Sequence, residues 1–156
     1  MLNVPHFNQR EDGFCLPACV QMVLAFYGVQ ANQEQLSKQM GVVAPIGTSL
    51  RSITRIRSSL PKTLTVSASE AEDVQQLYDA LSKGTPPVLR VITGDLPYWT
   101  FATTHALVLI GIEGEQAFVN DPAFSHAPIA LNREFLFLAW MNAGALFGLI
   151  ERQQNS

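Results

Sequence analysis

Apolar residues recur three or four positions apart through most of the first half of the chain, and from Pro86 onward their pattern changes to that of strands. The first spacing indicates the buried face of a helix, whereas Leu64, Val66 and Ala68 alternate with polar residues and indicate a half-buried strand. We expect helices at 16–27, 33–40, about 49–60, about 70–83 and 133–141. We expect strands at 64–68, 88–92, 105–112, 116–120 and 145–151. Helices come first in this order and strands second, which predicts an α+β fold with a cleft between the two layers.

Residues that favour helix ends support several of these boundaries. Asn32 precedes Gln35 by three residues, and Ser69-Glu70-Ala71-Glu72 has the pattern of a capping box. Thr48 or Ser49 is a candidate cap for the helix near 49–60, and Asn132 for the last helix. The helix near 49–60 is expected to turn its basic residues toward solvent, with an edge that binds a peptide or a carboxylate as the alternative interpretation: Arg51, Arg55 and Arg57.

The composition is that of a compact protein, with 47% hydrophobic and 15% charged residues among 156. This length, without any internal repeat, predicts one domain over residues 1–156. A net charge of −3 does not favour a nucleic-acid partner. The start of the chain has no signal-peptide pattern, and no run approaches the ~18 apolar residues of a membrane span. We therefore expect a cytoplasmic protein without a membrane segment.

The stretch 9–24 combines a turn, a cysteine and an apolar helix. Asp12-Gly13 favours a turn, and Pro17 suits the first turn of a helix. Cys15 is therefore expected at the helix N-terminus, where the macrodipole and unpaired backbone N–H groups stabilise an anion. Because a thiolate is an anion, this position lowers the thiol pKa and makes Cys15 a candidate nucleophile. Gln9 is a candidate side-chain donor to an oxyanion formed at the cysteine.

His105 begins an apolar strand, and Asp121 ends the next one. If 112–114 forms a three-residue hairpin loop, the register places His105 directly opposite Asp121. Opposed residues share a face, with Cβ atoms about 4.5–5.5 Å apart. A carboxylate there would orient the imidazole, so the residues together support a Cys15–His105–Asp121 catalytic triad.

Each of these residues also has an ordinary structural interpretation. A cysteine near a helix start is often a small buried hydrophobe, and a histidine on an apolar strand is often a satisfied core residue. An aspartate before proline is often a turn residue. Asn120 is an alternative orienting residue to Asp121, although neighbouring strand residues face opposite ways. Aromatic residues in the loop before His105 are as often packing residues as site residues, and we do not assign them: Tyr98, Trp99 and Phe101.

The two cysteines favour neither a disulfide nor a metal site. Cys15 and Cys19 are four residues apart on one expected helix, which suits disulfide geometry poorly. His6 and His126 lack the close spacing to them that a zinc site requires. We therefore expect Cys19 to pack in the core, and we expect no metal and no cofactor.

The order Gln9, Cys15, His105 at the head of an apolar strand, and Asp121-Pro122 after the next strand resembles the C39 peptidases. The resemblance covers essentially the whole chain. It implies a papain-like fold in which the nucleophile helix, in an N-terminal helical half, packs on a C-terminal antiparallel sheet. It also implies a cysteine peptidase that cleaves a peptide, typically a leader after a double glycine, through an acyl-enzyme. Gln9 and the backbone N–H of Cys15 would then form the oxyanion hole.

Two other functions stay open. A domain of this fold could bind a peptide without cutting it, and the same site could transfer an acyl group to an amine instead of water. The joint presence of Gln9, Cys15, His105 and Asp121 favours an enzyme, because a binding module has no physical need for all four.

Overall fold

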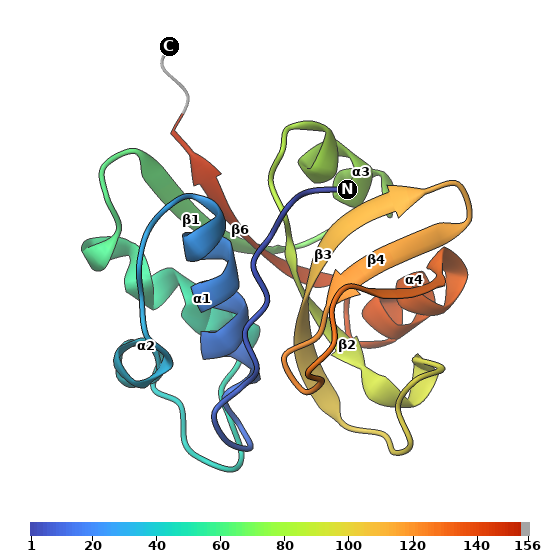
Figure 1. The fold of residues 1–156 in the computed structure, drawn as a ribbon, viewed down its shortest axis with the longest axis horizontal. Coiled ribbons are helices and arrows are strands. Elements are labelled where there is room, and N and C mark those ends of the chain that lie inside the picture. The colour runs from blue at the N-terminus through green and yellow to red at the C-terminus, as the bar shows by residue number, and fades with distance from the viewer. Residues whose placement is uncertain (154–156) are drawn as a thin grey trace.

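One six-stranded antiparallel sheet carries helices on both of its faces (Figure 1). The computed structural model describes residues 1–153. The strands follow the order β1-β6-β2-β3-β4-β5 across the sheet. Their bounds are β1 Leu64–Glu70, β2 Val88–Ile92, β3 Thr104–Glu113, β4 Gln116–Asn120, β5 Ile129–Asn132 and β6 Leu146–Arg152.

The helices and their caps agree with most of the predicted boundaries. They are α1 Cys15–Phe26, α2 Gln33–Met40, η1 Leu50–Ser59, α3 Gln75–Ser82, η2 Thr93–Asp95 and α4 Arg133–Asn142, of which η1 and η2 are 3₁₀ helices. Asn32 and Asn132 cap α2 and α4, each accepting a hydrogen bond from a backbone N–H of the first turn. Gly28 and Gly41 end α1 and α2 with positive φ angles, which glycine adopts without strain.

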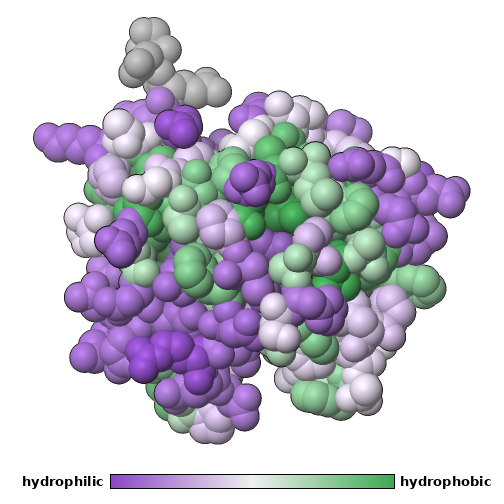
Figure 2. Space-filling model, viewed as in Figure 1, coloured by the Kyte–Doolittle hydropathy of each residue, from purple (hydrophilic) through white to green (hydrophobic). Residues whose placement is uncertain are grey.

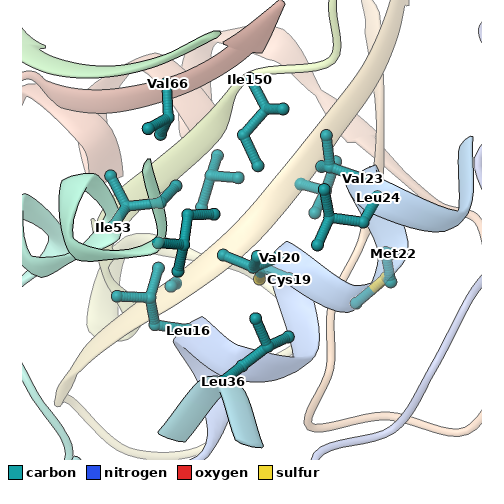
Figure 3. Packing of buried hydrophobic residues seen from close by; sticks show 14 of the residues in the cluster. Leu16, Cys19, Val20, Met22, Val23, Leu24, Leu36, Ile53, Val66 and Ile150 are labelled. Atoms are coloured by element: carbon teal, nitrogen blue, oxygen red, sulfur yellow. The ribbon is translucent and has the colours of Figure 1, made fainter. Parts of the chain in front are cut away.

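Two apolar clusters lie on opposite faces of the sheet. Val88, Ala106 and Val108 belong to the cluster covered by α1, α2 and η1. Leu89 and Leu107 belong to the cluster covered by α3 and α4. Because successive strand residues point to opposite faces, each central strand supplies both clusters and reads as a nearly continuous apolar run. Figure 3 shows the first cluster, with α1 side chains turned toward those of η1, β1 and β6.

The helix expected near 49–60 is a 3₁₀ helix rather than an α-helix. Its buried apolar residues, Leu50, Ile53 and Ile56, are spaced by three, and a 3₁₀ helix aligns that spacing on one face. Ser49 caps it, and its arginines are exposed as predicted.

The capping box predicted at 69–72 is wrong. Ser69 and Glu70 continue β1, where they pair with Phe147 and Leu146 of β6. Pairing with a distant strand therefore outweighs the local capping preference, and α3 begins only at Gln75. The four-residue strand β5 was not predicted, since it is too short to show a clear alternation.

The predicted α+β fold is confirmed, with the helix of Cys15 packed against the antiparallel sheet. Across the described residues, every helix is too short or too polar to traverse a lipid bilayer.

Candidate active site

Cys15 is the first residue of α1 and is partly exposed. Phe14 precedes it without a side-chain cap, so no side chain competes with an anion for the first-turn N–H groups. Burial raises the pKa of the Cys15 thiol, but a hydrogen bond and the charge of His105 lower it more, helped by the backbone of Ala106 and Leu16. The resulting pKa lies below the usual value of a thiol, chiefly because of His105.

His105 and Asp121 form a buried pair. The His105 Nε2 atom lies 2.7 Å from the Asp121 Oδ1 atom, and the two side chains are 5% and 0% exposed. Burial lowers the pKa of His105, but Asp121 and Cys15 raise it further, to about 9. Burial raises the pKa of Asp121, whereas His105 lowers it to a net value below the usual range. At neutral pH the pair is therefore an imidazolium and a carboxylate, which leaves Nδ1 of His105 for the thiol.

The register predicted for this pair is wrong, although the contact is present. Glu113 pairs with Gln116 across a two-residue turn, and Ile110 has no partner in β4, so the register shifts there. Continuing the pairing of Val108 with Asn120 places Leu107, not His105, opposite Asp121. Without the shift, Asp121 would lie opposite Val108, on the other face of the sheet from His105. The bulge thus restores the shared face, and a glycine within a strand, here Gly111, is the sequence signal for it.

Four donors converge on the carboxylate of Asp121. Its Oδ1 atom accepts from His105 and from the backbone N–H of Ala123 at 3.0 Å. Its Oδ2 atom accepts from the Tyr98 hydroxyl at 2.8 Å and from the Trp99 indole N–H at 3.0 Å. The Trp99 ring also lies 4.8 Å from the His105 ring, centroid to centroid. Sequence reasoning left both aromatics unassigned; the available signal was a loop pair with side-chain donors shortly before the histidine.

We expect Trp99→Phe to slow alkylation of the Cys15 thiol at neutral pH by roughly 10-fold, the value of one hydrogen bond to a charged group. The ring would still cover His105, but Asp121 would lose a donor that holds it ionised and oriented. The midpoint of the pH dependence of the alkylation rate should also lie at a higher pH than in the unmodified protein. Tyr78→Phe is the matched control, because the Tyr78 hydroxyl contacts Arg133 and not the site. Unchanged alkylation and pH dependence in Trp99→Phe would contradict a positioning role.

Gln9 lies beside the turn that follows Asp121. Its backbone N–H donates to the Pro122 carbonyl at 2.8 Å, and its side-chain Oε1 atom is buried without a hydrogen-bond partner. It lines a groove of about 570 Å³ with Trp99 and residues 122–124. Its assignment as an oxyanion donor stays a prediction.

The other candidates face elsewhere. Cys19 is fully buried among apolar neighbours and its pKa is raised, chiefly by burial; Figure 3 shows its sulfur inside the cluster. Asn120 donates to the Val4 carbonyl at 3.0 Å, toward the N-terminal segment, so it does not contact His105 through that amide. His6 contacts the Phe124 carbonyl.

A cavity of about 360 Å³ opens beside Cys15. Its walls come from the tip of α1, the loop before η1, and the facing parts of β2 and β3: Cys15, Leu16, 46–50, Arg90 and 104–106. In Figure 2 the surface is notched at its lower edge, between the lobe that carries α2 and the lobe that carries β4.

Comparisons with known proteins identify the family and the fold of this chain. A model of the Peptidase_C39 like family matches residues 1–146. A C39-like peptidase structure from Bacillus anthracis superposes with a TM-score of 0.82 at 15% identity, covering 99% of this chain and 98% of that one. The peptidase domain of Streptococcus ComA, a bifunctional ABC transporter involved in quorum sensing, superposes with a TM-score of 0.74 at 20% identity, covering 94% of this chain and 97% of that one. A double glycine motif protease from an AMS/PCAT transporter, in complex with the leader peptide, superposes with a TM-score of 0.71 at 22% identity, covering 97% of this chain and 94% of that one. No curated protein matches the chain.

Proposed function

The chain belongs to the Peptidase_C39 like family, and from this premise we propose that it is a cysteine peptidase that cleaves a peptide through a Cys15–His105–Asp121 triad. The observation that carries the proposal is the arrangement of these three side chains. The pKa of the Cys15 thiol is lowered by His105, which lines the same cavity, and the Nε2 atom of His105 is held by the buried carboxylate of Asp121. A structural cysteine needs neither the imidazole nor the carboxylate behind it.

In this mechanism the Cys15 thiolate attacks the scissile carbonyl carbon and forms the C–S bond. The resulting oxyanion is held by the first-turn N–H of Cys15 and by the side-chain N–H of Gln9, and each such donor contributes ~3–4 kcal/mol in comparable sites. The C–N bond then breaks as the imidazolium of His105 gives its proton to the leaving amine. Neutral His105 next removes a proton from water, which attacks the thioester and releases the acid.

The substrate class proposed is a peptide with small residues on its acyl side, such as a double-glycine leader. The support is the family membership and the likeness in fold to a double glycine motif protease. We propose hydrolysis rather than acyl transfer to an amine. The cavity beside Cys15 is open to solvent on one side, and water as the acceptor needs no separate binding site.

Alkylation of Cys15 by iodoacetamide across a pH series tests the proposal. We expect rapid labelling well below pH ~8.5, the ordinary thiol pKa, because His105 stabilises the thiolate. In His105→Ala the labelling should follow an ordinary thiol. Hydrolysis should fall as pH rises through about 9, where His105 loses the proton that the leaving amine requires.

The same series includes a quenched peptide with a central Gly-Gly and a matched peptide with Leu-Leu. Faster cleavage of the Gly-Gly peptide, lost in His105→Ala, supports the function. A Cys15 that labels no faster than a free thiol, in a protein that binds the Gly-Gly peptide without cutting it, would show a binding module instead.

A further inference from the structure

Among residues 1–153, Arg90 is a cation without an ion-pair partner in the cavity beside Cys15. It lies in the middle of β2 and is half-buried. Its Nε atom is buried and has no hydrogen-bond partner, and no carboxylate of residues 1–153 forms an ion pair with it. A buried N–H without an acceptor is destabilising and uncommon. The Arg90 guanidinium therefore needs a hydrogen-bond acceptor that residues 1–153 do not supply.

The face of the sheet on which the Arg90 side chain lies follows from its neighbours in β2 and β3. Val88 belongs to the apolar cluster under α1, whereas Leu89 belongs to the cluster on the other face. Because side chains alternate, Arg90 shares the face of Val88 and points toward α1. Ala106 lies directly opposite Arg90 on β3, and the backbone of Ala106 also interacts with the Cys15 thiol. The guanidinium and the nucleophile therefore open onto one cavity.

Apart from Cys15 and His105, the rest of the cavity wall is neutral or apolar. Thr48, Ser49 and Thr104 supply hydroxyl groups, and Ile46, which is 85% exposed, stands at the rim. None of the described residues that line the cavity is an aspartate or a glutamate. The groups that stabilise the thiolate are His105, Ala106 and Leu16, so the charge of Arg90 is not used there.

We propose that Arg90 is a specificity-determining residue that binds a carboxylate of the peptide substrate within the cavity beside Cys15. This inference rests on the proposed peptidase function. The planar guanidinium fork matches a carboxylate with two parallel N–H···O bonds, and a partly dry site strengthens them. Because Arg90 and Cys15 line the same cavity, the carboxylate must lie near the scissile bond along the peptide. Its source is either an Asp or Glu side chain or the C-terminal carboxylate of the peptide.

A set of internally quenched decapeptides with a central Gly-Gly tests this inference. One position at a time is fixed as Glu, Asp, Gln or Leu, the other positions are randomised, and each peptide is made with a free and with an amidated C-terminus. We expect Glu or Asp at one position to raise kcat/KM over Gln by roughly 10- to 100-fold, the range for a charge-assisted hydrogen bond. A preference for the free C-terminus instead would identify the terminal carboxylate as the ligand.

The decisive quantity is the ratio of rates for matched charged and neutral peptides, which cancels any general loss of activity. Arg90→Gln should bring this ratio near one, and Arg90→Lys should retain part of it. Arg152→Gln is the matched control, because Arg152 lies over the Tyr27 ring, outside this cavity. A ratio near one in the unmodified protein, or an equal ratio in Arg90→Gln, would overturn the inference.

Binding measurements separate this inference from the peptidase function. The same peptides are titrated into Cys15→Ser protein, with and without Arg90→Gln. Carboxylate-selective binding that requires Arg90, together with no cleavage of any of these peptides by the unmodified protein, would support the Arg90 site and end the peptidase proposal. Cleavage without any carboxylate preference would keep the peptidase and reject the Arg90 site.

Discussion

Replacing Cys15 by alanine is expected to abolish peptide hydrolysis, with a loss of about 10⁶-fold in kcat, the value for removal of the nucleophile of a serine peptidase triad. The thiolate forms the covalent bond to the substrate, and neither His105 nor the oxyanion donors can replace that step. The measurement is the steady-state hydrolysis of the central Gly-Gly peptide. Because Cys15 lies at the tip of α1 and is only partly buried, the variant should remain folded.

Cys19→Ala is the matched control for this variant. Cys19 lies one turn further along the same helix, fully buried, and its pKa is raised by burial. Its loss should leave kcat nearly unchanged and lower the free energy of unfolding by about 1 kcal/mol, through one small cavity. Hydrolysis that survives Cys15→Ala, or that disappears in Cys19→Ala without unfolding, would contradict the assignment of the nucleophile.

Asp121→Asn is expected to lower kcat by roughly 10²- to 10⁴-fold, with the upper value set by the corresponding change in a serine peptidase triad. An amide is not equivalent here, since four donors converge on the two oxygens of Asp121. If the amide oxygen faces His105, its NH₂ group faces the Trp99 indole N–H, which can only donate. If the amide is reversed, the NH₂ group faces His105 and the backbone N–H of Ala123. Either orientation displaces the imidazole.

Asp121→Ala should also lower the free energy of unfolding, by about 3–5 kcal/mol, because it leaves buried donors and an imidazolium without a partner. Asn120→Ala is the control: its amide contacts Val4 instead, so it should lose stability without changing the reactivity of Cys15. Chemical unfolding and iodoacetamide labelling measure the two effects. Equal losses of reactivity in the two variants would show that general loosening, and not orientation of His105, is responsible.

The stability difference between the unmodified protein and Asp121→Ala should depend on pH. The pKa of Asp121 is lowered in the fold, so its contribution is present above the usual carboxyl pKa of 3.8 and is lost as pH falls through the folded value. The pKa of His105 is raised, so its contribution is complete below 6.5 and is lost as pH rises through about 9. The difference should therefore be largest between about pH 4 and pH 6.5.

Local patterns determined most of the elements. The apolar spacing in 16–27, the cap at Asn32 and the apolar runs between 88 and 120 depend on neighbouring residues, and the structure agrees with them to within one or two positions. The placement of Cys15 at a helix tip is equally local, since Pro17 and the turn at Asp12-Gly13 require no distant partner.

The sequence by itself thus determined the α+β order, the cysteine at the start of its helix, and the presence of a histidine and an aspartate at the ends of neighbouring strands. Only the tertiary structure decided how these residues meet, because the bulge at Ile110 returns Asp121 to the face of His105. The structure also added the two aromatic donors to Asp121, Tyr98 and Trp99, and placed Arg90 in the cavity without an acceptor for its Nε atom among residues 1–153. The physical reason is range. Periodicity and capping act within a few residues, whereas strand register and the pairing of buried polar groups depend on segments that the fold brings together from distant parts of the chain.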